Sequence, residues 1–241
     1  NPDEDFSVAV YKQKAYETID DIYSRHKLPL LVGGSGQYVW SVLEGWEIPR
    51  VVPDPELRRR LERRAEELGL DSLYNELLKV DPVSAEKIDR RNVRRVIRAL
   101  EVFYQSNKPM SELKTKKPPG FASLIIGLTA ERKSLYQRTD ERIDIMLLHG
   151  LVEEVGRLKL KGYGRQHPAM NTIGYSHILD YLDGMLTLEE AVEKIKHDTH
   201  RFIRHQYAWF RLKDERICWF DIDQMTFEDM SGIASEHLRQ G

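Results

Sequence analysis

The chain has 241 residues, 41% of them hydrophobic and 32% charged, which is enough to build one domain with an insertion or two domains. Its 37 basic and 39 acidic residues give a formal net charge of −2, so a polyanionic partner would have to be bound by local basic patches. The single cysteine, Cys218, excludes an intrachain disulfide and a cysteine-based zinc site, and no stretch approaches the roughly 18 apolar residues of a membrane-spanning helix.

The first elements indicate an α/β sheet. A helical pattern over residues 7–25 precedes LPLLV (28–32), a continuous apolar run typical of a buried parallel strand. A glycine-rich turn and a second helical pattern follow: Gly33, Gly34, Ser35 and Gly36, then residues 37–43. This order can direct backbone N–H groups at an anion, although no lysine follows the glycines as it does in a Walker A loop. Tight packing between strand and helix would explain the glycines equally well.

The middle of the chain is charged and helical. Asp54 and Asp81 each precede a proline, an arrangement that begins helices, and Gly69 marks the end of the first of them. Another helix is expected over residues 90–104, with Val93, Ile97, Leu100 and Tyr104 buried. It carries a dense group of arginines: Arg90, Arg91, Arg94, Arg95 and Arg98. Contact with phosphates and ion pairs with acidic neighbours are both consistent with this density.

A second strand is expected at SLIIGLT (123–129), after the basic linker KTKKPP (114–119). The helix that follows places Arg138 and Arg142 four residues apart, on one face, where they could bind a diphosphate. Ion pairs with Asp140, Glu141 or Asp144 are the competing explanation. A third strand, ICWFDI (217–222), would bury the Cys218 thiol, and a final helix is expected over residues 226–239.

A long helix is predicted to begin at a Thr187–Glu190 capping box. Its core-facing stripe would comprise Val192, Ile195, Thr199, Phe202, Gln206 and Trp209. A second row could hold phosphates or could simply be a solvated face: His197, Arg201, Arg204 and Arg211. His197 and His200 share a face, but a third ligand cannot be identified, so we predict no metal site in this chain.

Seven segments occur in one order: VGGSGQYVWSVLEG, DPELRRRLE, RNVRRVIRALEVF, LYQRTDERIDIM, GLVEEV, IGYSHILDYL and KHDTHRFIRHQYAWFR. This series resembles the tRNA dimethylallyltransferase family, also called tRNA isopentenyltransferases, over residues 1–223. The resemblance implies transfer of a dimethylallyl group from dimethylallyl diphosphate to N6 of adenosine 37, in tRNAs that read codons beginning with U. It also implies a target base flipped out of the anticodon loop, because N6 of a stacked base is inaccessible.

The fold implied by the resemblance is an α/β, P-loop-NTPase-like parallel sheet core with a helical insertion domain. Residues 1–48 and 119–241 would belong to the core, the latter with the C-terminal helices, and residues 49–118 would form a tRNA-binding insertion. The family's P-loop, GPTxxGKS/T, and its DSxQVY segment, which carries the presumed general base, are not in this sequence. We therefore expect an N-terminally truncated chain that is inactive by itself, with Mg²⁺ bound only in the full-length enzyme.

Residue roles also follow from the resemblance. Arg142 and, as second choice, Arg138 would stabilise the departing diphosphate. Gly33, Gly34 and Gly36 would form a loop near the substrate. Residues expected to bind tRNA are Ser35, Arg58, Arg94, Arg95, Val96, Ile97, Arg98, Gly174, Tyr175, Arg201, Arg204, His205, Gln206 and Arg211. His205 stands where the family has an arginine, which leaves one fixed cation fewer at neutral pH.

The expected partners are a tRNA anticodon stem-loop and dimethylallyl diphosphate, for a monomeric, cytoplasmic protein with no membrane association. The main alternative is an adenylate isopentenyltransferase acting on free AMP, ADP or ATP, which would not need the arginines of residues 94–98. A P-loop small-molecule kinase and a non-catalytic RNA-binding protein are further alternatives. A GxxxxGK[ST] segment encoded upstream of Asn1 would distinguish the enzyme from a simple binding protein.

Overall fold

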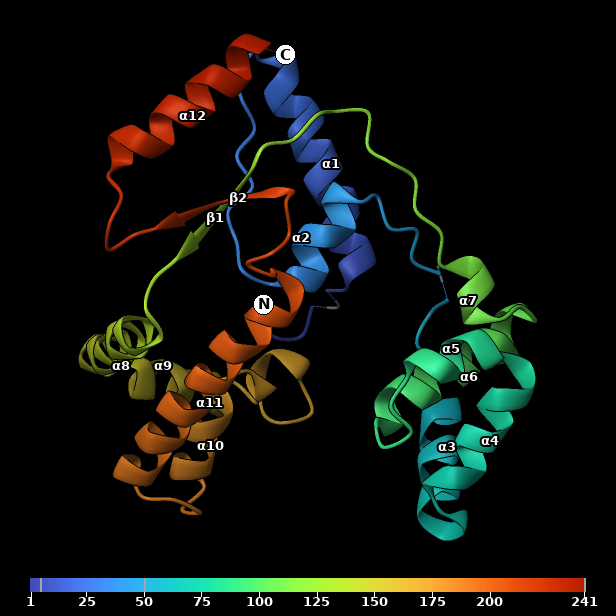
Figure 1. Ribbon diagram of the computed structural model, residues 1–241. Helices are drawn as coiled ribbons and strands as arrows, with labels where there is room; N and C mark the ends of the chain where they lie inside the picture. The colour runs from blue at the N-terminus through green and yellow to red at the C-terminus, as the bar shows by residue number, and fades with distance from the viewer. Residues whose placement is uncertain (5, 50, 241) are drawn as a thin grey trace. The chain divides into compact units, whose positions relative to one another are not determined.

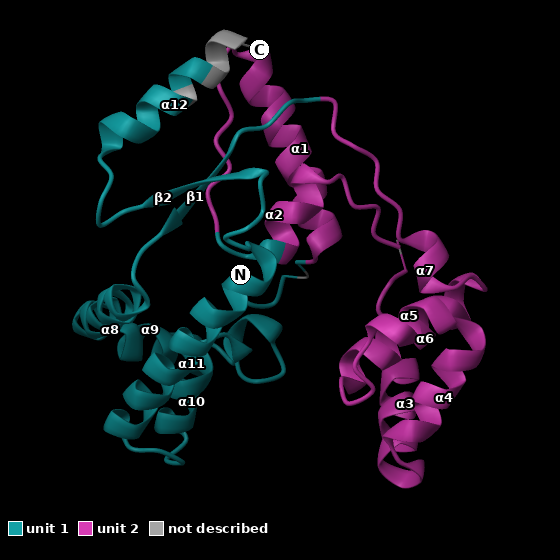
Figure 2. Ribbon diagram, in the orientation of Figure 1, with its two compact units in different colours: residues 1–6, 34–36, 121–241 teal, residues 7–33, 37–120 magenta. Residues whose placement is uncertain are grey.

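The computed structural model describes residues 1–4, 6–49 and 51–240. The chain divides into two compact units (Figure 2). Unit 1 comprises residues 1–6, 34–36 and 121–241, and unit 2 comprises residues 7–33 and 37–120. Among the described residues, every helix is too short or too polar to span a lipid bilayer.

Unit 2 begins with helix α1 (Val8–Ser24) and contains most of helix α2 (Gly36–Leu43), as predicted for both segments. The Ser7 hydroxyl caps α1 by accepting a hydrogen bond from the Val10 N–H (3.3 Å). The Tyr16 hydroxyl donates to the Val42 carbonyl (2.9 Å), which connects the two helices.

The rest of unit 2 is a group of five helices drawn in blue-green to green in Figure 1: α3 (Pro55–Leu68), α4 (Leu70–Val80), α5 (Pro82–Lys87), α6 (Val93–Ser106) and α7 (Met110–Leu113). The predicted caps are confirmed. The Asp54 carboxylate accepts from the backbone N–H groups of Glu56 and Leu57 (both 3.0 Å), and Asp81 does the same for Ser84 (3.0 Å).

These helices enclose an apolar core formed by Leu57, Leu61, Ala65, Leu73, Leu77, Ala85, Ile88, Val96, Ile97, Ala99, Leu100, Val102 and Met110. Tyr104, which was predicted to be buried, is 40% exposed, and the apolar Leu68 of α3 is 67% exposed. Each lies in the last turn of its helix, where fewer neighbours remain to cover a side chain.

Unit 1 contains two strands, β1 (Ile125–Thr129) and β2 (Ile217–Asp221), as predicted for the second and third apolar runs. They pair in parallel, with Ile125 opposite Ile217 and Thr129 opposite Asp221. The helices of this unit are α8 (Arg132–Leu148), α9 (Leu151–Leu160), the short 3₁₀ helix η1 (Pro168–Asn171), α10 (Tyr175–Leu182), α11 (Leu188–Trp209) and α12 (Phe227–Gln240). Helices α8 to α11 pack around a core of Ile143, Leu151, Val155, Met170, Ile178, Leu179 and Ile195 (Figure 1).

The strand predicted at residues 28–32 is wrong. This segment has no strand assignment, and the side chains of Leu30 and Val32 are 80% and 91% exposed. An apolar run becomes a strand only where a neighbouring strand supplies hydrogen-bond partners, and within the described residues no ladder reaches this segment.

Two predictions of burial also fail in unit 1. Cys218 is exposed, because it pairs in register with Ile126, which is itself 37% exposed, so this part of the sheet face is open to solvent. The buried stripe of α11 is formed by Ala191, Ile195 and Ile203, whereas Phe202 and Trp209 are 45% and 39% exposed. A four-residue step from Thr199 reaches Ile203, and the sequence spacing alone could not distinguish this from the three-residue step to Phe202.

Candidate nucleic-acid interface

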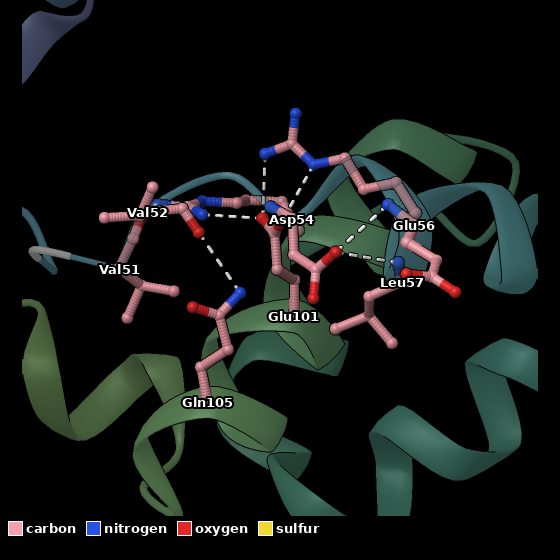
Figure 3. Close-up of polar contacts among 9 residues, drawn as sticks. Val51, Val52, Asp54, Glu56, Leu57, Glu101 and Gln105 are labelled. Atoms are coloured by element: carbon pink, nitrogen blue, oxygen red, sulfur yellow. Dashed lines mark hydrogen bonds and ion pairs between the residues drawn. The ribbon is translucent and has the colours of Figure 1, made fainter.

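In unit 2, a buried carboxylate lies between two of the arginines predicted to bind tRNA. Glu101 in α6 is fully buried, and each of its oxygens accepts two hydrogen bonds (Figure 3). Oε1 accepts from the Asp54 backbone N–H and from Arg58 Nε (both 2.8 Å), and Oε2 accepts from Arg58 Nη2 (2.8 Å) and Arg98 Nη1 (2.6 Å). Burial opposes ionisation of the Glu101 carboxyl, but the four hydrogen bonds from these three residues prevail and hold its pKa below the ordinary value.

Further hydrogen bonds hold the segment before α3 against α6. Arg98 Nη2 donates to the Val51 carbonyl (3.1 Å), and the Gln105 side chain donates to the Val52 carbonyl (3.1 Å; Figure 3). The Arg58 and Arg98 side chains remain 37% and 31% exposed. Ion pairing, one of the two explanations offered for the arginine-rich run, therefore applies to Arg98 and leaves part of its guanidinium open to solvent.

The remaining arginines of the run differ from one another. Arg91 precedes α6 and pairs with Asp89 (2.9 Å), so it does not lie on the helix that carries the later arginines of the run. Arg94 and Arg95 are exposed, and neither side chain forms an ion pair with any described residue. Two exposed cations on one helix could contact phosphates.

Val96 and Ile97, also predicted to contact tRNA, are only 2% and 3% exposed. Both side chains belong to the apolar core of unit 2. We therefore restrict the RNA contacts predicted for this run to its arginines, and assign packing to these two side chains.

Lys114 lies close enough to Arg95 and Arg98 to form one basic surface with them. The sequence did not predict this role, because Lys114 was interpreted as part of a linker. Partial desolvation and the positive charges of Arg95, Arg98 and Lys87 lower the pKa of the Lys114 ammonium group, against the opposing charge of Asp81. Like charges gathered this closely favour the binding of an anion. The signal in the sequence was the density of lysines in KTKK, residues 114–117.

In unit 1, the two arginines predicted to bind diphosphate lie on α8, which follows β1 directly. Arg138 Nη2 pairs with Asp223 Oδ1 (2.6 Å), just beyond the carboxyl end of β2. The carboxyl ends of parallel strands are the usual ligand-binding edge of an α/β sheet. Arg142 is exposed and forms no ion pair within the described part of the chain.

The acidic residues proposed as competing partners of these arginines are engaged elsewhere. Asp140 Oδ1 accepts from His200 Nε2 (2.8 Å), Asp144 pairs with Lys196 (2.9 Å), and Glu141 accepts from Gln137 (3.0 Å). Neither arginine is therefore neutralised by its own helix.

Helix α8 is joined to α11 by a polar and aromatic cluster. The rings of Tyr136 and His200 stack with centroids 4.0 Å apart and planes 10° apart. Arg204 Nη1 donates to the Tyr136 hydroxyl (3.1 Å), which places this predicted tRNA-binding residue next to α8. Arg204 was predicted from the sequence, whereas Tyr136 was not, and Asp140 was considered only as an ion-pair partner of the α8 arginines. The four-residue spacing of Tyr136 and Asp140 puts both on one face of α8.

The glycine-rich segment packs against the end of α11. Gln206 Nε2 donates to the Gly34 carbonyl (3.0 Å). A Cβ atom at Gly36 would overlap the Cβ and ring of Trp209. Close approach to this helix thus accounts for glycine at position 36, whereas Ser35 between them is exposed.

The other predicted tRNA-binding residues of unit 1 are more scattered. Arg201 and His205 are exposed on α11, whereas Arg211 lies beyond the last residue of that helix, so the predicted row ends at Arg204. Gly174 has φ of 95° at the start of α10. The Tyr175 hydroxyl donates to Glu154, and this hydrogen bond, with burial, raises the pKa of Tyr175 to about 12.

Comparisons with known proteins place these observations in a family. A family model described as IPP transferase matches residues 1–213. The chain belongs to the IPP transferase family. It is 45% identical over 241 residues to the tRNA dimethylallyltransferase of Thermomicrobium roseum, covering all of this chain and 73% of that protein. It is also 47% identical over 211 residues to the tRNA dimethylallyltransferase of a Roseiflexus species, covering 88% of this chain and 69% of that protein.

Solved structures agree with this assignment. The full-length tRNA isopentenylpyrophosphate transferase of Bacillus halodurans superposes with a TM-score of 0.65 and 35% identity, covering all of this chain and 75% of that one. A eukaryotic dimethylallyltransferase acting on tRNA superposes with a TM-score of 0.73 at 23% identity, over 99% of this chain and 64% of that one, and supports the fold alone. The IPP transferase chain thus has an α/β fold that is mostly helical with a small parallel sheet.

Proposed function

We propose that the enzyme that contains this chain carries out prenyl transfer to tRNA, moving a dimethylallyl group from dimethylallyl diphosphate to an adenine amino group. The observation that carries this proposal is Arg142, an exposed arginine with no ion pair among the described residues, on the helix that follows β1. Its relatives at 45% and 47% identity are named tRNA dimethylallyltransferases. A free guanidinium on the helix that follows a strand of a parallel sheet, one turn beyond Arg138, suits a diphosphate leaving group.

The chemistry explains why such a cation is needed. The adenine amino nitrogen is a weak nucleophile, so the bond between the allylic C1 and the diphosphate oxygen lengthens as the new C–N bond forms. Both electrons of the broken bond go to the diphosphate, and the amino nitrogen then releases a proton to a base that we do not assign within this chain. Arg142 would stabilise the charge on the departing oxygen, and Arg138 could join it after exchanging Asp223 for the diphosphate.

The finer details of the proposal come from the resemblance described above. The acceptor would be N6 of adenosine 37, in tRNAs that read codons beginning with U, and the enzyme would act as a cytoplasmic monomer. The parallel pairing of β1 and β2 is consistent with a P-loop-NTPase-like core, with residues 49–118 as the insertion. The predicted Gly33, Gly34 and Gly36 loop would lie near the substrate.

Mg²⁺, expected in the full-length enzyme, would accompany the diphosphate. Magnesium is commonly held by one or two carboxylates together with substrate phosphates. Among the described residues, no group of three or more histidine, cysteine, aspartate or glutamate side chains could hold a metal ion.

An adenylate isopentenyltransferase is the competing function, and the basic surface of unit 2 argues against it. Arg94 and Arg95 are exposed on α6, and the charge of Arg95 helps to lower the pKa of the nearby Lys114. A free mononucleotide offers too few phosphates to need these cations in addition to the α8 arginines.

The test is to express the natural gene that encodes this chain in a bacterium that lacks its own tRNA prenyltransferase. Mass spectrometry of digested tRNA should then detect N6-isopentenyladenosine next to the anticodon. Purified enzyme given equal concentrations of stem-loop RNA and AMP should modify the RNA. Prenylated AMP with unmodified RNA would instead establish the competing function, and no prenylated product of either kind would contradict both.

A further inference from the structure

Glu101 is a charged residue that no predicted role explains. It is fully buried, and it adds a negative charge beside arginines that are proposed to meet a negatively charged ligand. A buried carboxylate is costly unless every lone pair is satisfied, and here four donors satisfy them. Replacing a buried ion pair by apolar residues of similar volume is often neutral or stabilising, so stability alone does not explain a carboxylate at this position.

What Glu101 does is fix the orientation of two cations. Arg58 is held through Nε and Nη2 together, which is a bidentate contact that fixes the plane of its guanidinium. Arg98 is held by Glu101 at Nη1 and by the Val51 carbonyl at Nη2. A long side chain fixed before binding loses less conformational entropy when it contacts a ligand.

Each of these arginines keeps donors that are free to bind something else. Within the described residues, Nη1 of Arg58 and Nε of Arg98 have no hydrogen-bond acceptor. Both side chains are about one-third exposed, at 37% and 31%. Each side chain thus contacts Glu101 and keeps part of its surface accessible to solvent.

We propose that Glu101 is a positioning residue for RNA recognition, which orients Arg58 and Arg98 so that their free N–H groups meet the phosphate backbone of the substrate RNA. This inference rests on the proposed function. Glu101 touches no RNA itself, because it is fully buried. It acts through the two arginines.

The substitution Glu101→Gln makes the inference testable. An effect of overall charge and a loss of arginine positioning would change the affinity for RNA in opposite directions. Glu101→Gln removes one negative charge, so attraction to a polyanion at longer range would become stronger. Loss of positioning would weaken binding, because a glutamine amide cannot accept all four hydrogen bonds and its N–H₂ group would face an arginine.

The experiment measures the affinity of the full chain for an anticodon stem-loop RNA over a series of NaCl concentrations. For Glu101→Gln we expect the Kd to rise by about ten- to a hundredfold, as for loss of a hydrogen bond to a charged group. The slope of log K against log salt should fall by about one, which a change in overall fold stability would not produce. In an Arg58→Gln, Arg98→Gln background, the same substitution should have no further effect.

The matched control is Glu76→Gln, which removes the partner of Arg64 (2.7 Å) elsewhere in unit 2. Its Kd should stay within about twofold of wild type, as expected for a partly exposed pair. Equal weakening by both substitutions would assign the effect to general destabilisation and overturn the inference. Binding by Glu101→Gln that equals or exceeds wild type, with circular dichroism showing a folded protein, would also overturn it.

A measurement on the unmodified protein covers the case in which Glu101→Gln does not fold. In ¹⁵N-arginine spectra, Arg58 Nε–H should be as rigid as the backbone, with an order parameter near 0.85, while Arg94 should be mobile, below about 0.6. Addition of stem-loop RNA should shift the Arg58 and Arg98 signals. RNA that binds while both signals stay unmoved would overturn the inference, whereas wild-type protein that fails to bind the RNA would contradict the proposed function instead.

Discussion

Glu101 and Asp81 are carboxylates that unit 2 buries completely, and both accept hydrogen bonds from neighbouring and from distant parts of the chain. Asp81 accepts from the Ser84 backbone (3.0 Å), the Ser111 hydroxyl (2.6 Å) and the Ser111 backbone (3.0 Å). Burial opposes ionisation at both positions, but the hydrogen bonds prevail and lower both pKa values. The free energy of unfolding of unit 2 should therefore depend on pH through these two carboxyl groups.

The free energy of unfolding should depend on pH through Glu101. A depressed carboxyl pKa contributes stability above the ordinary value of 4.5 and loses it as pH falls through the lower folded value. At pH 7 we expect Glu101→Gln to lower the free energy of unfolding by about 3 kcal/mol, since it breaks a buried ion pair. As pH falls below 4.5 and through the lower folded value, wild type and variant should approach one another in urea unfolding, and a difference independent of pH would contradict this account.

The partners of single residues were the part of the site that the sequence could not supply. Glu101 meets Arg58 across 43 residues, and Arg138 meets Asp223 across 85. Helical spacing predicts which residues share a face, but it carries no information about which distant carboxylate lies opposite. The local acids considered for Arg138 and Arg142 were therefore the wrong partners.

At the scale of secondary structure, helices were predicted well because their ends are encoded locally. Asp54, Asp81 and Thr187 each cap the helix that follows, and Gly69 ends α3 with φ of 82°. Strands depend on partners distant in sequence. The strands predicted at β1 and β2 are confirmed because each pairs with the other, whereas the strand predicted at residues 28–32 is wrong because no strand pairs with it among the described residues.

Packing of the glycine-rich segment on α11 predicts the effect of adding one methyl group. Gly36→Ala would place its Cβ against the Cβ and ring of Trp209, which cannot move away without shifting the helix. We expect a loss of about 1–3 kcal/mol in the free energy of unfolding, as in other overpacked sites. Thermal unfolding would measure it.

Gly156→Ala in α9 is the matched control for that substitution. A Cβ there meets no atom within 4 Å, and its φ is not positive, so alanine should stabilise the helix by up to about 1 kcal/mol. If Gly36→Ala and Gly156→Ala change the free energy of unfolding equally, the contact with Trp209 is not the reason that position 36 requires glycine.

At the scale of the whole molecule, the two units have separate apolar cores. One lies among α3 to α7 and the other among α8 to α11, and they share no residue. Cores that do not share side chains can unfold independently. The basic surfaces described above are divided in the same way, with Arg58, Arg98 and Lys114 in unit 2 and Arg142 and Arg204 in unit 1.

Calorimetry should therefore resolve two transitions. Leu77 and Ile178 are both completely buried, one in each core. Leu77→Ala should lower the midpoint temperature of the transition of unit 2, and Ile178→Ala that of unit 1. Each shift should correspond to a loss of about 2–5 kcal/mol in the free energy of unfolding of that unit, and the other transition should stay in place. A single transition that both variants lower would show that the units unfold together.

The central claim is that Arg142 stabilises the departing diphosphate during prenyl transfer to tRNA. Its most direct test is the rate of transfer of labelled dimethylallyl groups to stem-loop RNA by the enzyme made from the natural gene. Arg142→Ala should lower kcat by about 10²–10³, the usual cost of losing one preorganised donor, while Lys133→Ala on the same helix should not change it. An Arg142→Ala enzyme with wild-type kcat and wild-type affinity for dimethylallyl diphosphate would contradict the claim.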